Sequence, residues 1–401
     1  MQVSTAARRA LVASALGWML DAMDVLLYSF VLDEVRREFG IDDKVSGFLL
    51  ALPLAASAVG GVAFGWLADR FGRTRALTAS ILVYSVATAA CGLAQSVGQL
   101  ALGRVILGLG MGGEWATGAA LVAETWPAEH RGKAMGLMQS AWAVGYALAA
   151  AVNALVLPRF GWRAVFFVGL APALVTLWIR RRVPESPLWL AGQSRPREVS
   201  GIGSVLRGPA AHTTWILAAM NAATMFAWWG LFTWIPSYLA RPTQQGGAGL
   251  SIVRSSTWII VMQVGMWCGY VSFGFIADSI GRKKTYVIYL LTAAALVPLY
   301  AATRDARWLL VLGPVLAFFG TGYFSGFGAV SAELFPTHLR ATAQGLTYNI
   351  GRALSALAPI AVGTLAAGYG LAWAFLVTSA GFVLAAVLWI WIPETRGREL
   401  A

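Results

Sequence analysis

GWLADRFGR, the stretch at residues 65–73, returns 209 residues later as GFIADSIGR at residues 274–282. The same offset places Glu124 on Glu333, and Pro184-Glu185 on Pro393-Glu394. Unrelated apolar segments would not match at several separate places with one common offset. The repeat therefore predicts two related halves, residues 1–182 and 213–401, joined by a linker at residues 183–212.

Apolar segments surround both copies of this stretch. Of the 401 residues, 58% are hydrophobic and 12% are charged, compared with about 25% charged in an ordinary soluble domain. Runs of the roughly 20 apolar residues that cross a bilayer recur along nearly the whole chain. We place the spans near residues 10–32, 46–67, 76–95, 99–122, 136–158, 162–180, 213–238, 256–277, 284–302, 307–330, 340–366 and 370–392. The prediction is an all-α integral membrane protein with twelve transmembrane helices in two six-helix bundles.

The basic residues set the expected topology. A formal net charge of +12 would also fit a nucleic-acid-binding protein, but nearly all of the basic residues lie between the predicted spans. Roughly twice as many of them fall on the side of the N-terminus as on the other side, which is the bias of cytoplasmic loops. We therefore expect a multi-pass protein of the cell membrane with both termini in the cytoplasm, surrounded by lipid and without a nucleic-acid partner.

The even number of spans in each repeat has a consequence for function. Two halves of six spans have the same orientation and are related by an axis along the membrane normal. Transporters built in this way bind substrate between their halves, near the bilayer midplane. The repeat therefore indicates a transporter with a central site, which can work as a monomer.

Both copies of the repeated stretch resemble the signature loop between the second and third helices of the major facilitator superfamily, and the resemblance covers essentially the whole chain. In that family the loop looks like a gate latch, which implies a gating role for Asp69, Arg73, Asp278 and Arg282. Asp69 is expected to face the positive end of a neighbouring helix, and Arg73 is expected to pair with an acid such as Glu124. Ser279 stands where an arginine would be expected, so the second latch should be weaker.

Three further segments are similar to the proton-coupled organic-acid symporters of that superfamily, the group that includes sialate, lactate and aromatic-acid carriers. They are residues 20–24 in the first span, 104–115 in the fourth and 229–236 in the seventh. Residues 184–187 and 393–395 also resemble sugar porters, which keeps a sugar carrier open. Against it, the seventh span lacks the glutamine-rich pattern of those porters.

Charged residues inside spans are the first candidates for function. A charge at the bilayer centre costs about 2.5–3.5 kcal/mol, so it is rarely kept without a role. Five such residues occur: Asp21, Asp24, Arg104, Glu114 and Arg352.

The first span holds two of these acids one helical turn apart. Tyr28 returns to the same side of the helix as Asp24, so Asp21, Asp24 and Tyr28 can border one cavity. Two neighbouring carboxylates repel in a low dielectric, and at least one should bind a proton near neutral pH. Asp21, Asp24 and Glu114 are therefore the candidate proton carriers. In the alternative interpretation, Asp21 or Asp24 only neutralises Arg352 or Arg104 as a structural pair.

Arg352 is the leading candidate to bind substrate, because an arginine fork can hold a carboxylate by two parallel hydrogen bonds. Asn349 and Tyr348 lie three and four residues before it, on a shared helix face. Trp229, with Trp228, Phe232 and Trp234, could line the cavity for an aromatic substrate, although such residues more often pack or face lipid. The alternative for Arg352 is an interhelical ion pair. Arg104 is expected to stiffen the bundle through backbone carbonyls.

No span offers a cofactor or metal site. Gly108, Gly110, Gly112 and Gly113 lie inside an apolar helix, where small residues favour close helix packing rather than nucleotide binding. Cys91 and Cys268 lie in spans of different halves without a metal-ligand partner nearby, and we expect both thiols to be buried. A nucleophile beside a base is also missing, so we expect neither an enzyme nor a bound cofactor.

These observations predict a proton-coupled symporter that imports a small organic anion by alternating access. The expected substrate is a carboxylate such as a monocarboxylate, a sialate or an aromatic acid. A sugar or polyol symporter and a drug exporter share the fold, so they remain the alternatives. A non-transporting sensor would usually bring a soluble output domain, and the longest loop, at about residues 181–212, is too short for one.

Overall fold

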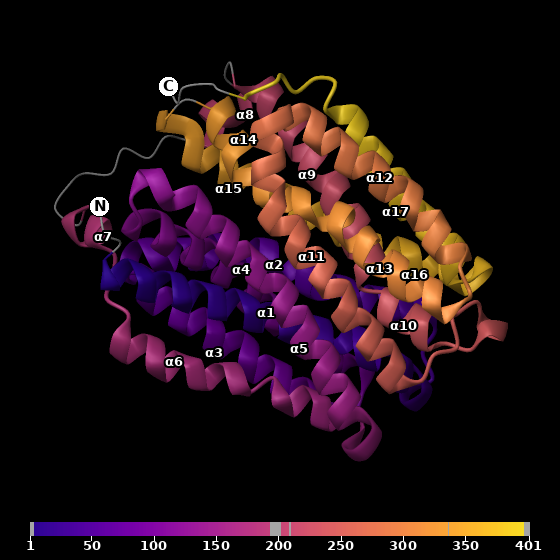
Figure 1. Ribbon diagram of the computed structural model, residues 1–401. Coiled ribbons are helices and arrows are strands. Elements are labelled where there is room, and N and C mark those ends of the chain that lie inside the picture. The colour runs from indigo at the N-terminus through magenta and orange to yellow at the C-terminus, as the bar shows by residue number, and fades with distance from the viewer. Residues whose placement is uncertain (1–3, 193–201, 208–209, 336, 397–401) are drawn as a thin grey trace.

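The regular structure of the chain is helical throughout the part that the computed structural model describes, which is residues 4–192, 202–207, 210–335 and 337–396 (Figure 1). Residues 193–201 and 208–209 of the predicted linker lie outside the described residues.

The first half of the chain forms six long helices. They are α1 (Thr5–Phe39), α2 (Asp43–Phe71), α3 (Arg73–Cys91), α4 (Val97–Thr125), α5 (Ala128–Val168) and α6 (Ala171–Arg182). Two short helices, α7 (Pro187–Gly192) and α8 (Ile202–Arg207), follow in the predicted linker.

The second half contains more breaks. Its elements are α9 (Ala211–Phe232), α10 (Ile235–Ala240), η1 (Thr243–Gln245), α11 (Ile252–Ile280), α12 (Arg282–Ala302), α13 (Ala306–Thr321), η2 (Gly322–Gly326), α14 (Phe327–Leu334), α15 (Thr337–Ser355), α16 (Leu357–Tyr369) and α17 (Leu371–Leu388). The predicted span at 307–330 is thus divided among α13, η2 and α14, and the span at 340–366 is divided between α15 and α16.

Eleven helical segments of the described chain are long and apolar enough to cross a membrane. One of them, residues 133–182, covers two of the predicted spans. Gly161 breaks it with a φ of 76°, a left-handed conformation that glycine adopts without steric cost. The twelve predicted crossings are therefore all represented by helix.

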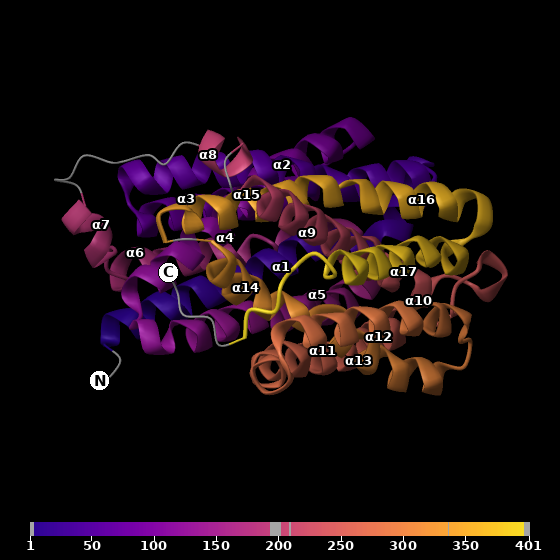
Figure 2. The ribbon, with the colours of Figure 1, turned by 90° about the horizontal axis from the view of Figure 1, so that it is seen from above.

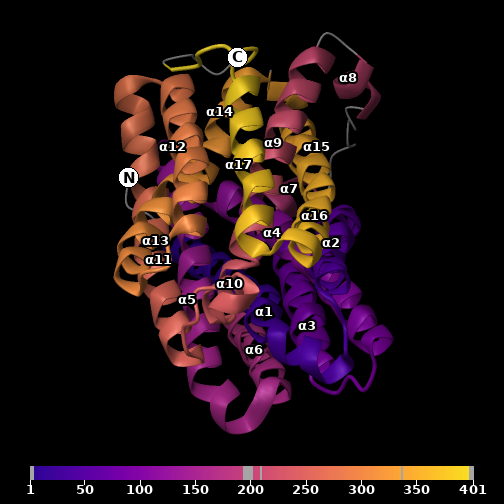
Figure 3. The same ribbon diagram turned by 90° about the vertical axis from the view of Figure 1, so that its right-hand side faces the viewer.

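The helices form two bundles that lie side by side (Figures 1 and 2). Helices α1–α6 make one bundle and α9–α17 the other, and the bundles meet mainly where α5 packs on α11 and where α2 packs on α16 (Figure 3). Asn153 of α5 donates a hydrogen bond to Ser256 of α11 at 3.0 Å. Gly47 of α2 lies against the carbonyl of Pro359 in α16, where a Cβ would not fit.

The glycine run of α4 packs helices closely, as predicted. A Cβ on Gly108 or Gly112 would collide with the backbone of α2, and one on Gly110 would lie 2.7 Å from the backbone nitrogen of Tyr84 in α3. The prediction for the two cysteines is half right, because Cys91 is buried whereas Cys268 is exposed.

The first signature loop holds the ends of three helices together. Arg73 donates to Glu124 of α4 through two nitrogens, at 3.2 and 3.0 Å, and also pairs with Asp69. Glu185, which follows α6, accepts hydrogen bonds from the backbone N–H groups of Arg73 and Thr74 at 2.8 and 3.2 Å. The carboxylate therefore occupies the positive end of α3.

The second loop repeats this arrangement with fewer contacts. Arg282 pairs with Asp278 at 2.5 Å and reaches Glu333 through one nitrogen at 3.3 Å. Glu394 accepts from the backbone N–H of Arg282 and of Lys283, at 2.8 and 3.1 Å. The Pro-Glu pair is repeated in the sequence, but its capping role was not predicted.

The contact expected between Asp69 and a neighbouring helix end stays a prediction. The side chains at the start of α5 (residues 128–132) and of α15 (residues 337–342) lie outside the described residues.

Glu394 gives the second cap a testable dependence on pH. Its partial burial alone would raise the pKa of Glu394, but hydrogen bonds from the backbone N–H groups of Arg396, Arg282, Lys283 and Thr395 hold that pKa below the ordinary value of 4.5. A carboxyl whose pKa is lower in the folded state stabilises that state above its ordinary pKa, and the contribution is lost as the pH falls through the folded-state value. Glu394→Gln should therefore reduce stability at neutral pH by about 1 kcal/mol, the usual cost of a lost helix cap.

Melting temperatures in detergent at neutral pH and well below pH 4.5 check this expectation. The difference between Glu394→Gln and the unmodified protein should shrink in acid. Glu34→Gln, which removes an acid from a surface pair with Arg37, should have little effect at either pH. An equal difference at both pH values would contradict the capping role.

Candidate functional site

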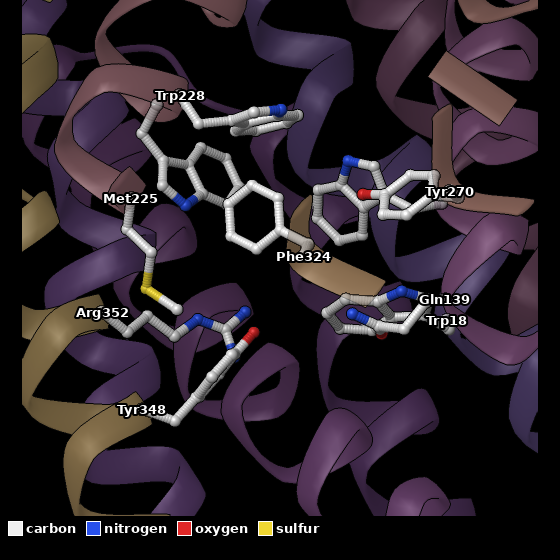
Figure 4. Close-up of a pocket in the computed structure, with 10 residues that line it drawn as sticks. Trp18, Gln139, Met225, Trp228, Tyr270, Phe324, Tyr348 and Arg352 are labelled. Atoms are coloured by element: carbon white, nitrogen blue, oxygen red, sulfur yellow. The ribbon is translucent and has the colours of Figure 1, made fainter. Parts of the chain in front are cut away.

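A pocket lies at the seam between the two bundles (Figure 4). The N-terminal bundle contributes Trp18 of α1 with Gln139 and Trp142 of α5, and the other bundle contributes the rest of the wall. Those residues are Met225, Trp228 and Trp229 of α9, Tyr270 of α11, Phe324 of η2, and Tyr348 and Arg352 of α15. Most of the lining is aromatic, and Arg352 is its one charged residue.

Arg352 is a buried cation for which the described residues supply no direct partner. Its exposed fraction is 3%, and no side chain or backbone group of the described chain forms an ion pair or a hydrogen bond with its guanidinium. The guanidinium carbon lies 6.0 Å from the centre of the Tyr348 ring. In Figure 4 the guanidinium points into the pocket. A buried charge without a counter-ion is unfavourable, so the pocket is suited to an anion.

The aromatic walls meet across the seam. Trp142 of α5 makes edge-to-face contacts with Trp228 and Trp229 of α9, each with ring centres 5.8 Å apart. Trp18 packs on the other side of Trp142 at 4.6 Å. The indole N–H groups of Trp18 and Trp142 have no acceptor among the described residues, so the walls offer unused hydrogen-bond donors.

Three buried acids lie in the N-terminal bundle and outside the pocket lining. Asp21, Asp24 and Glu114 are all 0% exposed, and none of their carboxyl oxygens has a hydrogen-bond partner in the described chain. Glu114 of α4 sits in the notch left by Gly17, because a Cβ there would come 2.5 Å from its Oε1 atom. Gly17 and Asp21 are one turn apart on α1, so Glu114 and Asp21 lie along the same helix interface.

These acids lie behind one wall of the pocket. Trp18, which lines the pocket, lies next to Gly17 and one helical turn before Asp21 on α1. An ionised carboxylate without partners is unfavourable in such a site, whereas a protonated one is tolerated. The acids are therefore chemically able to hold protons close to the pocket.

The residues predicted to bind substrate divide into two groups. Arg352, Tyr348 and Trp229 line the pocket, while Tyr28 and Asn349 do not. The guanidinium carbon of Arg104 instead lies over the ring of Tyr28, 4.6 Å from the ring centre. Asn349 packs beside Gly61 of α2 and donates to the carbonyl of Gly345 at 2.9 Å.

Asp21, Asp24 and Tyr28 were expected to be able to border one cavity. None of the three lines this pocket. Tyr28 is turned instead toward Arg104, which donates to the backbone carbonyls of Leu49 and Val25 at 3.2 and 3.4 Å. The structural role expected for Arg104 is therefore confirmed.

Six of the lining residues are not among those predicted from the sequence: Trp18, Gln139, Trp142, Met225, Tyr270 and Phe324. The spacing of some of these residues along their helices could have identified them. Trp18 lies one turn before Asp21, and Gln139 and Trp142 are three residues apart, so each pair shares a helix face.

An ion network also missed by sequence analysis joins the bundles at the far end of α2 from the first signature loop. Arg241, just after α10, binds both oxygens of Asp43 at 2.9 and 2.6 Å and binds Asp33 of α1 at 2.9 Å. Arg36 also reaches Asp43 at 3.2 Å. Burial alone would lower the pKa of Arg241, but Asp43 and Asp33 raise it above its ordinary value. The charged form is thus held in place.

Known proteins resemble the chain over almost its whole length. The profile of the Major Facilitator Superfamily matches residues 14–273 and 248–401. A protein of Cupriavidus pinatubonensis named "Probable 4-methylmuconolactone transporter" is 35% identical over 95% of this chain and 89% of its own. A sialic acid transporter of Escherichia coli is 31% identical, over 95% and 93% of the two chains. The crystal structure of a D-xylose-proton symporter shares the fold with a TM-score of 0.79, at 22% identity, over 98% of this chain and 99% of that one.

The Arg241 network should contribute measurably to stability. Arg241→Gln leaves Asp33 and Asp43 with fewer partners, and removing one member of a buried ion pair typically costs about 3 kcal/mol or more. The double variant Arg241→Gln/Asp43→Asn should recover part of the loss, because one of the unpaired acids is then neutral. Denaturation of the purified proteins in detergent measures both changes. Equal stability of the unmodified protein and Arg241→Gln would argue against the network.

Proposed function

The chain belongs to the Major Facilitator Superfamily, and from that membership we propose that it carries a small organic anion together with protons across the cell membrane. It is a multi-pass membrane transporter and not an enzyme. We propose alternating access, in which residues 1–182 and 213–401 rock about the pocket and residues 183–212 connect them.

Arg352 is the observation that carries the proposal. It is the one charge of the pocket, it is buried, and its guanidinium is unpaired among the described residues. A carboxylate can accept two parallel hydrogen bonds from such a fork and neutralise its charge. The two relatives reported above are named for organic acids, which supports a carboxylate as the cargo.

The same chemistry weighs against the alternatives. A sugar presents several hydroxyl groups, each of which donates as well as accepts. The polar groups of the pocket are mainly donors, and the carbonyl oxygen of Gln139 already accepts from Trp115. A cationic drug would be repelled by Arg352. A small anion with an apolar body fits the pocket better than either of these.

Asp21, Asp24 and Glu114 are the proposed proton carriers. In the proposed import cycle, one or more of them is protonated from outside while Arg352 binds the carboxylate. The centre of the protein then holds fewer unpaired charges, because one acid is neutral and Arg352 is paired, which lowers the cost of passing through the closed state. Carboxylate and proton leave on the cytoplasmic side.

The ion pairs at the two ends of the bundles are the proposed gates. If both termini lie in the cytoplasm, as the distribution of basic residues favours, the Arg241 network is at the outer end. The signature loops with Asp69, Arg73 and Glu124, and with Asp278 and Arg282, are then at the inner end. Both sets are formed in this structure, and breaking one set while the other stays formed would expose the pocket to one side at a time.

Proton coupling can be tested in proteoliposomes. Uptake of a carboxylate should increase with an inward proton gradient, because protonation accompanies each import cycle. Asp24→Asn should retain exchange of substrate across the membrane but lose accumulation driven by the gradient. Glu34→Gln, a surface control, should behave as the unmodified protein. Accumulation that does not respond to the gradient would remove protons from the mechanism.

Anion binding at Arg352 can be tested by thermal unfolding in detergent. A ligand at 100 times its Kd stabilises the folded state by about 2.7 kcal/mol, so a panel of carboxylates, neutral sugars and cationic drugs separates the candidate functions. We expect stabilisation by carboxylates alone, its loss in Arg352→Gln, and weaker binding in Arg352→Lys, which keeps the charge without the fork. Stabilisation by neutral sugars alone would exclude the organic-anion proposal.

A further inference from the structure

A stacked pair of rings joins the two bundles beside the pocket. Trp115 of α4 and Tyr348 of α15 lie parallel, with ring centres 4.1 Å apart and an angle of 4° between their planes. Tyr348 lines the pocket and lies one helical turn before Arg352. Trp115 is not part of the lining, so its influence on substrate must act through its neighbours.

One of those neighbours is Gln139. The indole Nε1 of Trp115 donates to the Oε1 atom of Gln139 at 3.3 Å. An indole N–H is only a donor, so the side-chain oxygen of Gln139 must face Trp115. The NH2 group of Gln139 then points away from Trp115, and no group of the described chain accepts a hydrogen bond from it. Because Gln139 lines the pocket, this NH2 is available to a ligand.

Arg352 and Gln139 lie on opposite sides of the pocket (Figure 4). The rest of the lining is mainly aromatic rings from both bundles, which suit an apolar body. A substrate held at Arg352 by its carboxylate therefore extends toward a second donor. A ligand that cannot accept a hydrogen bond there leaves that amide unsatisfied when water is excluded, which is unfavourable.

We propose that Trp115 is a positioning residue that fixes Gln139 as a hydrogen-bond donor, so that the site selects organic anions with a carboxylate at one end and a hydrogen-bond acceptor at the other. This inference rests on the proposed function and deepens it. The acceptor can be a ring nitrogen, a carbonyl, a hydroxyl or a second carboxylate. The stack on Tyr348 also ties the orientation of Gln139 to the contact between the two halves.

The experiment compares acids that have the same shape and differ in the acceptor. Pyridine-3-carboxylate and pyridine-4-carboxylate each replace one CH group of benzoate by a nitrogen that accepts a hydrogen bond. Kd values are measured by thermal shift on the full-length protein in detergent. We expect at least one of the pyridine acids to bind about tenfold more tightly than benzoate.

Two variants test the roles of the residues separately. Trp115→Phe keeps a ring to stack on Tyr348 but removes the N–H, so Gln139 can turn and the preference for the pyridine acid should fall several-fold. Gln139→Leu should remove the preference, which is measured in each variant as the ratio of the Kd values of benzoate and the pyridine acid. Trp373→Phe, which changes an exposed tryptophan of α17, should preserve the full preference and controls for the substitution itself.

The outcomes separate this inference from the proposed function. Benzoate and both pyridine acids binding equally to the unmodified protein, with all binding lost in Arg352→Gln, would overturn the selectivity and leave the anion site intact. An unchanged preference in Trp115→Phe would overturn the positioning role. Failure of every carboxylate to bind the unmodified protein would overturn both this inference and the proposed function.

Discussion

The positive charge of Arg352 is the constraint on which the rest of the site depends. A guanidinium that is nearly excluded from solvent requires compensation, and the described structure gives it no direct counter-ion. The walls around it are mainly rings, which exclude water and strengthen electrostatic attraction at close range. The arginine and the aromatic walls thus form a site that favours an anion.

The two halves are held together by contacts of different kinds. Within the N-terminal bundle, α4 and α2 touch backbone to backbone through Gly108 and Gly112, which makes that pair of helices difficult to separate. Across the seam, much of the holding is done by side chains, such as the Trp115–Tyr348 stack and the Arg241 network. Ring contacts and ion pairs can break and re-form without unfolding a helix. The seam also contains a close backbone contact, where Gly47 of α2 lies against the carbonyl of Pro359 in α16, so it combines both kinds of contact.

The fold could be predicted from sequence because its determinants are local or repeated. Helix length follows from runs of apolar residues, and the two halves follow from one offset. The site could be predicted only in part. Arg352 was found because a charge inside a span is conspicuous, whereas Trp142 and Gln139 resemble ordinary helix residues until the second bundle is placed against them. Tyr28 and Asn349 lie outside the pocket lining, because spacing along one helix does not determine which neighbouring helix fills the space beside it.

The rings of Trp142, Trp228 and Trp229 come from two separate helices, and the ionic contacts at the ends of the bundles do not involve them. Exchanging one of these rings for a smaller side chain would reshape the pocket and leave the ion pairs at both ends intact. The shape of the pocket can therefore change by a single substitution in this wall, without altering the ionic contacts that brace the bundles.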